Sequence, residues 1–216
     1  MPRKEQSPWK PRRAEKPFKA WKPWSRELWR PGREPLDWFR ALVCAILSVV
    51  LVFTFAIRLV GVSGYSMVPT LQDGDRLLLL NNWLSGDYRR GDIIVLRKES
   101  LMREPIVKRV IATEGQTVDI DFAAGSVFVD GQLLDEPYIN EQTYTDEGVE
   151  FPLTLREGEL FVMGDNRNRS TDSRDLRIGS VEESCVIGRA VLLLYPGEDI
   201  GTGRRDFRRI GPLGRA

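Results

Sequence analysis

The chain has 216 residues, of which 42% are hydrophobic, enough for one main folded domain with smaller additional segments. It contains no histidine, and its two cysteines, Cys44 and Cys185, are far apart in the sequence. These counts exclude a nucleophilic site with an imidazole base and a zinc site that needs histidine, and two distant cysteines cannot form a thiolate cage.

The formal net charge of +1 conceals an uneven distribution of charge along the chain. Residues 1–36 carry 11 Lys/Arg against 4 Asp/Glu, whereas residues 59–216 carry 19 against 26. Five of the six tryptophans lie among the prolines and basic residues of the N-terminal part: Trp9, Trp21, Trp24, Trp29 and Trp38. We interpret residues 1–36 as a basic tail, and two alternatives stay open for it, a disordered segment and a segment that contacts anionic lipid.

An uncharged run of 17 residues, ALVCAILSVVLVFTFAI, lies between Arg40 and Arg58. At ~1.5 Å per residue, a helix of this length is at the short end of what spans a hydrocarbon core of ~30 Å. Flanking aromatic residues and snorkelling arginines extend it, so we predict a transmembrane helix over residues 37–60. A cleaved signal peptide and a buried core helix are the alternatives. The excess of Lys and Arg before the run places residues 1–40 in the cytoplasm and residues 59–216 outside it.

Short apolar runs separated by Gly, Pro, Asn and Asp follow this helix. They predict strands at residues 76–81, 92–96, 106–112, 117–120, 159–163 and 185–195. The stretch SVFVDGQLL alternates on both sides of Asp130 and Gly131, which predicts a hairpin with a type I′ turn.

No long amphipathic helix is expected after the membrane segment. We therefore predict a mainly β fold, with an antiparallel β-sheet domain over residues 61–196. A loop-rich insertion is expected at about residues 136–157, and residues 197–216 are expected to form a flexible tail.

The stretch GVSGYSMVPTL, residues 61–71, carries a serine between small and conformationally restricted residues. Gly64 relieves backbone crowding and Pro69 favours extended geometry at Val68, so Ser66 can occupy a tight exposed turn with its N–H free to meet an oxyanion. A serine hydroxyl becomes a good nucleophile only beside a base. Here that base must be Lys, Asp or Glu, because arginine stays protonated.

Only two lysines follow the apolar run, Lys98 and Lys108. Lys98 lies in the polar sequence RKES, which is typical of a solvated loop. Lys108 lies in IVKRVIA, and in a strand Ile106, Lys108, Val110 and Ala112 share one face, so the amine is carried among apolar neighbours. Desolvation lowers the pKa of a lysine toward the range of a general base. A structural or snorkelling lysine is the alternative that this pattern leaves open.

Four blocks of the sequence occur in an informative order: SMVPTL at residues 66–71 followed by Gly74-Asp75, RGDIIV at 90–95, VKRVI at 107–111, and GDNRNRSTDSR at 164–174. In this order, and over about residues 38–196, the chain resembles type I signal peptidases. These are membrane-anchored Ser-Lys endopeptidases that remove signal peptides from exported proteins. The single apolar run resembles the smaller members, which have one anchor.

The resemblance implies that Ser66 is the nucleophile and Lys108 the general base. It also implies that Ser170 hydrogen-bonds the lysine amine and that Asp172 pairs with Arg174 to keep the site in shape. The supporting residues are therefore Gly164, Ser170, Asp172 and Arg174. The implied substrate has small side chains one and three positions before the cut, the Ala-x-Ala pattern. We expect these side chains to contact Val62, Gly64, Met67, Leu71, Ile106 and Val107.

Three features of the sequence depart from the family pattern. Gly64 stands where some members have a serine that assists the oxyanion hole, so here the hole is expected to use backbone N–H groups. Residues 112–116, ATEGQ, replace a common turn sequence, and Arg169 stands where asparagine is frequent. The block at 164–174 is rich in Asp and Asn, but arginines at alternate positions fit a calcium loop poorly.

The expected partners are preproteins and the lipid bilayer, in a plasma or thylakoid membrane, with no cofactor, no metal and no nucleic acid. Two alternative functions remain. One is a catalytically silent membrane protein whose β domain binds exported polypeptides. The other is a different Ser-Lys peptidase related to self-cleaving repressors, but those are soluble and carry DNA-binding segments.

Overall fold

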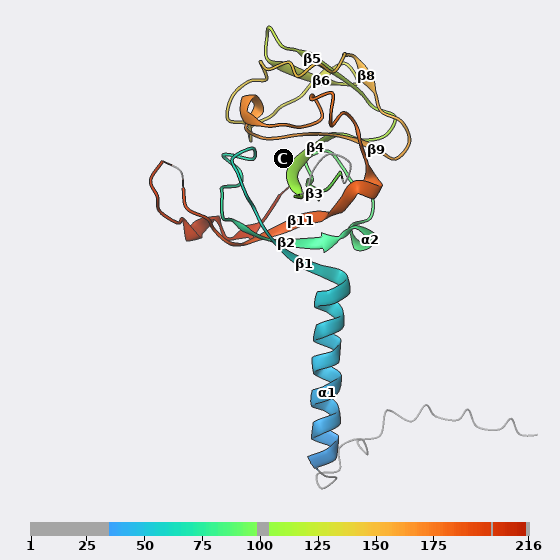
Figure 1. Ribbon diagram of the computed structural model, residues 1–216, viewed down its shortest axis with the longest axis vertical. Helices are drawn as coiled ribbons and strands as arrows, with labels where there is room; N and C mark the ends of the chain where they lie inside the picture. The colour runs from blue at the N-terminus through green and yellow to red at the C-terminus, as the bar shows by residue number, and fades with distance from the viewer. Residues whose placement is uncertain (1–34, 99–103, 200, 215–216) are drawn as a thin grey trace, which may run out of the picture. The chain divides into compact units, whose positions relative to one another are not determined.

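The computed structural model describes residues 35–98, 104–199 and 201–214 (Figure 1). The predicted basic tail at residues 1–36 lies almost entirely outside the described residues. Helix α1 covers Pro35–Leu51 and continues through a π-helical turn, η2, at Val52–Ala56. The segment Asp37–Ala56 is long and apolar enough to cross a membrane.

The membrane helix was expected to reach residue 60, and this boundary is wrong. Residues Ile57–Gly61 form strand β1, which pairs with β2 in a continuous antiparallel register from Ile57 opposite Leu80 to Gly61 opposite Arg76. The apolar composition of β1 resembles that of the helix before it, so the sequence shows no boundary between them. The backbone N–H and C=O groups of β1 bond to β2 and not to residues of the same helix.

The main sheet has eight antiparallel strands among the described residues. Their order is β1-β2-β11-β3-β4-β9-β10, and β12 pairs with β11. The bounds are β1 Ile57–Gly61, β2 Arg76–Asn81, β3 Ile93–Leu96, β4 Ile106–Ala112, β9 Glu159–Met163, β10 Val181–Glu182, β11 Val186–Tyr195 and β12 Gly211–Pro212. The predicted mainly β, antiparallel fold is confirmed.

A second sheet has the order β7-β6-β5-β8 and lies beyond β9, away from β1 and β2 (Figure 1). Its strands are β5 Thr117–Asp121, β6 Ser126–Val129, β7 Gln132–Leu133 and β8 Leu153–Thr154. Asp130 and Gly131 have φ values of 54° and 74°, so the predicted type I′ hairpin is formed. The loop-rich insertion predicted at 136–157 contains one short strand, β8. The remaining short helices are α2 Asn82–Ser85, η3 Arg167–Arg169, η4 Glu183–Cys185 and η5 Phe207–Arg209.

The central strands are buried on both faces, which explains why their sequences are continuous apolar runs. In β3, Ile93 and Val95 belong to one hydrophobic cluster together with Met67, whereas Ile94 and Leu96 belong to another. A third cluster joins β4 and β9 to the second sheet. The core therefore surrounds β3 and β4, the strands that adjoin the serine-bearing turn.

The shared face predicted for β4 does not extend along the whole strand. Ile106 and Val110 pack with one cluster, but Ala112 belongs to the cluster under the second sheet. A register shift between Val110 and Ala112, opposite β9, accounts for the change because a bulge re-aims the side chains that follow it.

The C-terminal segment also differs from the prediction of a flexible tail. Strand β12 pairs with Leu192 and Leu193 of β11, and Leu213 packs against the cluster that contains Met67. Arg209 forms an ion pair with the buried Asp75. These contacts hold the described part of residues 197–214 against the sheet.

Candidate active site

Ser66 and Lys108 are brought together from two segments that are 42 residues apart in the sequence. Ser66 lies in the turn after β1, and Lys108 is the third residue of β4. A hydrogen bond of 2.7 Å joins Lys108 Nζ to Ser66 Oγ. The lysine is only 3% exposed, whereas the serine is half-buried. The hydroxyl is therefore within reach of solvent while its partner amine is enclosed.

Burial changes the protonation of this amine. It lowers the pKa of Lys108 from 10.5 to about 8, and the positive charge of Arg174 acts in the same direction. The negative charge of Asp172 opposes this change, but it is a smaller influence than the desolvation. At neutral to mildly alkaline pH a substantial fraction of the lysine is therefore neutral and can accept a proton.

The turn that carries Ser66 is anchored by its apolar residues. Met67 and Leu71 are almost completely buried in the core, and the N–H of Leu71 donates to the carbonyl oxygen of Met67 at 2.8 Å. Gly64 has a φ of +93°, and its N–H donates to Asp73 Oδ1 at 2.8 Å. A side chain at position 64 would be strained in this conformation, which gives a physical reason for the glycine in this chain.

Residues of the 164–174 block hold the backbone on either side of Ser66. The N–H of Asn166 donates to the carbonyl oxygen of Ser66, and its side-chain amide donates to that of Tyr65, both at 3.0 Å. Gly164 packs directly against this backbone. A Cβ at position 164 would collide with the carbonyl oxygen of Ser66 and with the Ser170 hydroxyl.

A buried ion pair connects the turn to β4. Arg109, the residue after Lys108, makes two hydrogen bonds to the carboxylate of Asp165, at 2.8 and 2.7 Å. The hydroxyl of Thr70 donates to the same carboxylate. Both members of the pair are at most 2% exposed. The turn and the strand that carries Lys108 are thus held by a common carboxylate.

Asp172 and Arg174 form the predicted ion pair, with two hydrogen bonds of 2.9 Å between buried side chains. Asp172 also accepts the N–H of Gly164 at 2.9 Å. The predicted hydrogen bond between Ser170 and Lys108 is not formed. The Ser170 hydroxyl is buried against Gly164 without a hydrogen-bond partner, and the Lys108 amine donates to Ser66.

A narrow groove of about 190 Å³ lies beside the Ser66–Lys108 pair. Its lining residues come from the start of the domain and from β4: Val60, Gly61, Val62, Ser63, Ser66, Met67, Glu104, Pro105, Ile106, Val107 and Lys108. Four of the predicted substrate-binding residues, Val62, Met67, Ile106 and Val107, therefore line it. Leu71 does not, since it is fully buried in the core, and Gly64 is also outside the lining.

Four residues of the site had no role predicted from the sequence: Thr70, Arg109, Asp165 and Asn166. Each lies inside one of the four sequence blocks, so the blocks themselves were the available signal. Lys98, the other lysine of the domain, donates to the carbonyl oxygen of Ile178 at 2.7 Å, so it is partly buried rather than fully solvated.

The arrangement combines a half-buried hydroxyl, a desolvated amine and an adjoining groove lined by both apolar and polar residues. This combination suits nucleophilic attack on an extended peptide. Over the described ranges, no group of three or more cysteine, aspartate or glutamate side chains is placed to hold a metal ion.

The sequence matches a family model and several known proteins. Residues 36–195 match the family model described as signal peptidase, peptidase S26. A signal peptidase I of Bacillus licheniformis is 33% identical over 172 residues, which cover 76% of this chain and 90% of that protein. Signal peptidase I T of Bacillus subtilis (strain 168) is 34% identical over 170 residues, covering 74% of this chain and 86% of that protein. The crystal structure of a signal peptidase I from Enterococcus faecalis V583 is 33% identical, covers 48% of this chain and 97% of its own, and has a TM-score of 0.40.

Proposed function

The chain belongs to the signal peptidase family, peptidase S26, and we propose that it removes signal peptides with a Ser66–Lys108 dyad. The observation that carries this proposal is the hydrogen bond of 2.7 Å between a half-buried hydroxyl and a buried amine whose pKa is lowered to about 8. Such a pair replaces the serine and imidazole of other serine peptidases in a chain that has no histidine.

In the proposed mechanism the neutral amine of Lys108 accepts the proton of the Ser66 hydroxyl. Ser66 Oγ attacks the scissile carbonyl carbon, and the backbone N–H of Ser66 stabilises the oxyanion. The lysine then donates its proton to the leaving amine, and an acyl-enzyme ester remains on Ser66. The amine next removes a proton from water, and the water oxygen attacks the ester carbonyl. Lys108 returns this proton to Ser66 Oγ as the acyl group leaves, which regenerates the hydroxyl.

The groove supports a preference for small side chains, the Ala-x-Ala pattern. In an extended peptide, residues one and three positions before the cut point to the same side, because side chains alternate along a strand. The proposed binding mode adds the substrate as a strand beside the backbone of residues 61–64 and 106–108. The groove volume of about 190 Å³, shared by two side chains, favours residues of the size of alanine over large ones.

The apolar helix and the family together indicate a membrane-anchored protein. We propose one retained anchor over Asp37–Ala56, with the N-terminal segment in the cytoplasm and the β domain on the outer side of a plasma or thylakoid membrane. The excess of basic residues before the helix supports this orientation. The substrates in this proposal are preproteins whose hydrophobic segments are still in the bilayer.

The decisive experiment is cleavage of a preprotein with an Ala-x-Ala site by the detergent-purified full chain. The wild type is compared with Ser66→Ala and Lys108→Ala, and Lys98→Ala is the matched control for loss of a partly buried lysine. We expect cleavage by the wild type and the control, and none by the two dyad variants. Cleavage by either dyad variant at the wild-type rate would exclude the proposed dyad. Binding of the preprotein without cleavage by any form would favour the catalytically silent alternative.

A further inference from the structure

A buried carboxylate lies at the end of the turn that carries Ser66. Asp75 is fully buried. Its Oδ1 accepts the N–H of Gly197 at 2.6 Å, and its Oδ2 accepts the N–H of Gln72 at 2.8 Å. Burial of a carboxylate costs several kcal/mol unless a cation and hydrogen bonds compensate it. The Asp75 carboxylate is not part of the proposed dyad, so its burial needs another explanation.

The compensating cation is Arg209, from the C-terminal segment. Its Nη1 donates to Oδ1 of Asp75 at 3.0 Å and its Nη2 to Oδ2 at 2.7 Å, which is the bidentate geometry of a strong pair. Nη2 also donates to the carbonyl oxygen of Thr70 at 3.1 Å. The neighbouring Arg208 is exposed. One of two adjacent arginines therefore binds the nucleophile-bearing turn at two points.

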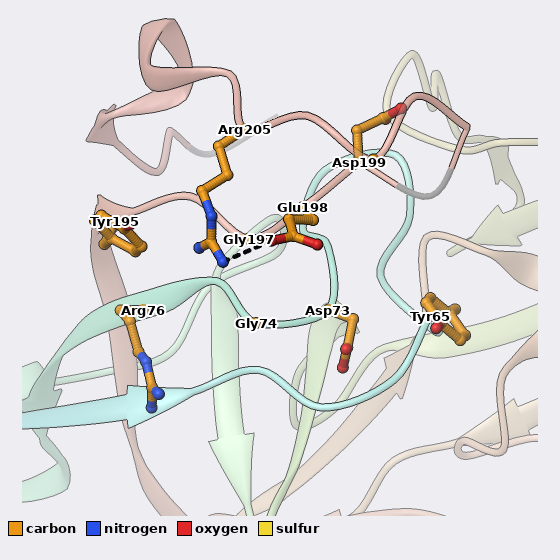
Figure 2. Close-up of a pocket in the computed structure, with 10 residues that line it drawn as sticks. Tyr65, Asp73, Gly74, Arg76, Tyr195, Gly197, Glu198, Asp199 and Arg205 are labelled. Carbon is orange, nitrogen blue, oxygen red and sulfur yellow. Dashed lines mark hydrogen bonds and ion pairs between the residues drawn. The ribbon is translucent and has the colours of Figure 1, made fainter.

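The C-terminal segment meets this turn around an open pocket of about 660 Å³ (Figure 2). Tyr65, Asp73 and Gly74 line it from the turn, and Glu198 and Arg205 line it from the C-terminal segment. Polar contacts at its border join the two segments, including a hydrogen bond of 3.0 Å from Gln72 to Asp199. The two segments are not in direct contact where the pocket lies between them. Polar contacts at its border, such as the pair of Arg209 and Asp75, therefore contribute strongly to holding them together.

Thr70 connects these contacts to the proposed dyad. Its carbonyl oxygen accepts from Arg209, while its hydroxyl donates to Asp165. Asp165 is in turn held by Arg109, the residue that follows Lys108 in β4. In addition to its buried apolar residues, the chain between Ser66 and Asp75 is thus held to the strand that carries Lys108 through Asp165, and to the C-terminal segment through Arg209.

We propose that Arg209 is a positioning residue, which holds the turn so that Ser66 Oγ stays within hydrogen-bonding distance of Lys108 Nζ. This inference rests on the proposed function. Without the guanidinium, Asp75 becomes an unpaired buried charge and the Thr70 carbonyl loses a donor, so the turn relaxes. Arg209 does not line the groove beside the dyad, so substrate binding is affected less than the chemical step.

The test is single-turnover cleavage of a preprotein, with full-length enzyme in saturating excess. Under these conditions the folded enzyme still saturates the substrate when part of the enzyme is unfolded. A variant that only lowers the folded fraction therefore keeps the wild-type rate constant. We expect Arg209→Gln to reduce the rate constant about 10- to 100-fold, the size of effect produced by misplacing a reacting group by about 1 Å. KM should change by less than about threefold, and Arg208→Gln, the matched control, should behave as the wild type.

Two further variants sharpen the test. Arg209→Lys keeps a charge for Asp75 but cannot make the bidentate pair and the Thr70 contact together, so its rate constant should also fall. If Arg209→Gln does not fold, the rate constant of Arg209→Lys tests the inference in its place. Arg209→Ala should regain part of the rate when guanidinium is added at millimolar concentration, whereas Arg208→Ala should not respond.

The outcomes separate the two proposals. If the wild type does not cleave, the proposed function fails and this inference with it. If the wild type cleaves and the rate constants of the Arg209 variants equal those of the Arg208 variants, the inference alone is overturned. A defect confined to KM would overturn it equally.

Discussion

Lys108 shows how burial can prepare a side chain for acid–base chemistry. The lysine lies in a strand whose other residues after Ile106 are all buried, and it has Asp172 near enough to favour its charged form. Desolvation nevertheless outweighs this attraction and lowers the pKa to about 8. A fully solvated lysine, with a pKa near 10.5, would be neutral in only a minute fraction of molecules at pH 7.

The first prediction concerns the pH dependence of activity. Because the dyad requires the neutral amine, kcat/KM should rise with a midpoint near pH 8, reaching roughly a tenth of its maximum at pH 7 and roughly nine-tenths at pH 9. Lys108→Arg should abolish turnover at every pH, since a guanidinium cannot accept the proton. Initial rates at low preprotein concentration, measured between pH 6 and pH 10, provide the check. A profile that stays level across this range would contradict the assignment of the base.

The second prediction concerns stability. The folded pKa of about 8 lies below the ordinary value of 10.5, so between these values the unfolded state binds more protons and the stability of the wild type rises with pH. Below pH 8 the full cost of burying the charge is present, and above pH 10.5 it is absent. Lys108→Met removes this cost. The free energy of unfolding of Lys108→Met minus that of the wild type should therefore be ~2–4 kcal/mol larger at pH 7 than at pH 10.5.

Chemical unfolding in detergent at several pH values measures this difference. Lys98→Met is the control for loss of a lysine outside the proposed dyad. A difference between Lys108→Met and the wild type that does not change with pH would show that the amine is not desolvated in the folded state.

At the scale of elements, the turn after β1 and strand β4 must be held in register. The pair of Arg109 and Asp165 does this from a buried position, and Thr70 shares the same carboxylate. We predict that Asp165→Asn, which leaves the guanidinium buried without its counter-charge, lowers the free energy of unfolding by ~3–5 kcal/mol. Glu198→Gln removes the carboxylate of an exposed ion pair with Arg205 and should cost less than ~1 kcal/mol. Equal costs for the two variants in denaturant unfolding would refute the importance of the buried pair.

Several strands were predictable because their signals are local. The bounds of β2 and β4 agree with the prediction, and β3 differs by one residue, since each is a run of apolar residues ended by turn formers. Strand β1 was not predicted, because Leu59 and Val60 continue the apolar character of the membrane helix. The order of the C-terminal segment was missed for a different reason. It depends on a pairing between Arg209 and Asp75, which are 134 residues apart. A contact between such distant residues produces no local pattern in the sequence.

The residues alone made Lys108 a candidate base and did not decide its role. Without histidine a serine needs Lys, Asp or Glu as its base, and the pairing of Ser66 with Lys108 was implied by the resemblance to type I signal peptidases. The environment of Ser170 could not be derived from the sequence. Its hydroxyl is placed by close packing against Gly164, and such contacts between loops depend on the folded backbone.

For the whole molecule, the short chain distance between the apolar helix and the proposed nucleophile, Ser66, has a functional consequence. Ser66 follows the end of the apolar helix at Ala56 by ten residues, and five of the intervening positions form β1. Even fully extended, this length reaches at most ~35 Å. A peptidase built this way can act on a chain whose hydrophobic segment is still embedded in the same bilayer. The side of the membrane on which the domain lies therefore determines which proteins it can process.

That orientation gives the last prediction. The basic residues before the helix favour a cytoplasmic N-terminus, so positions 20 and 87 should lie on opposite sides of the membrane. In a chain carrying Cys44→Ala and Cys185→Ala, single reporters are introduced as Ala20→Cys or as Asp87→Cys, an exposed position. A membrane-impermeant maleimide added to intact expressing cells should label the reporter at 87 and should reach the one at 20 only after lysis.

Each reporter chain must still cleave preprotein, so that labelling is measured on folded enzyme. Labelling at position 20 in intact cells would reverse the proposed topology. Recovery of an active chain that has lost the position-20 reporter would instead identify the apolar run as a cleaved signal peptide, because a retained anchor keeps residues 1–36 and the β domain on one polypeptide.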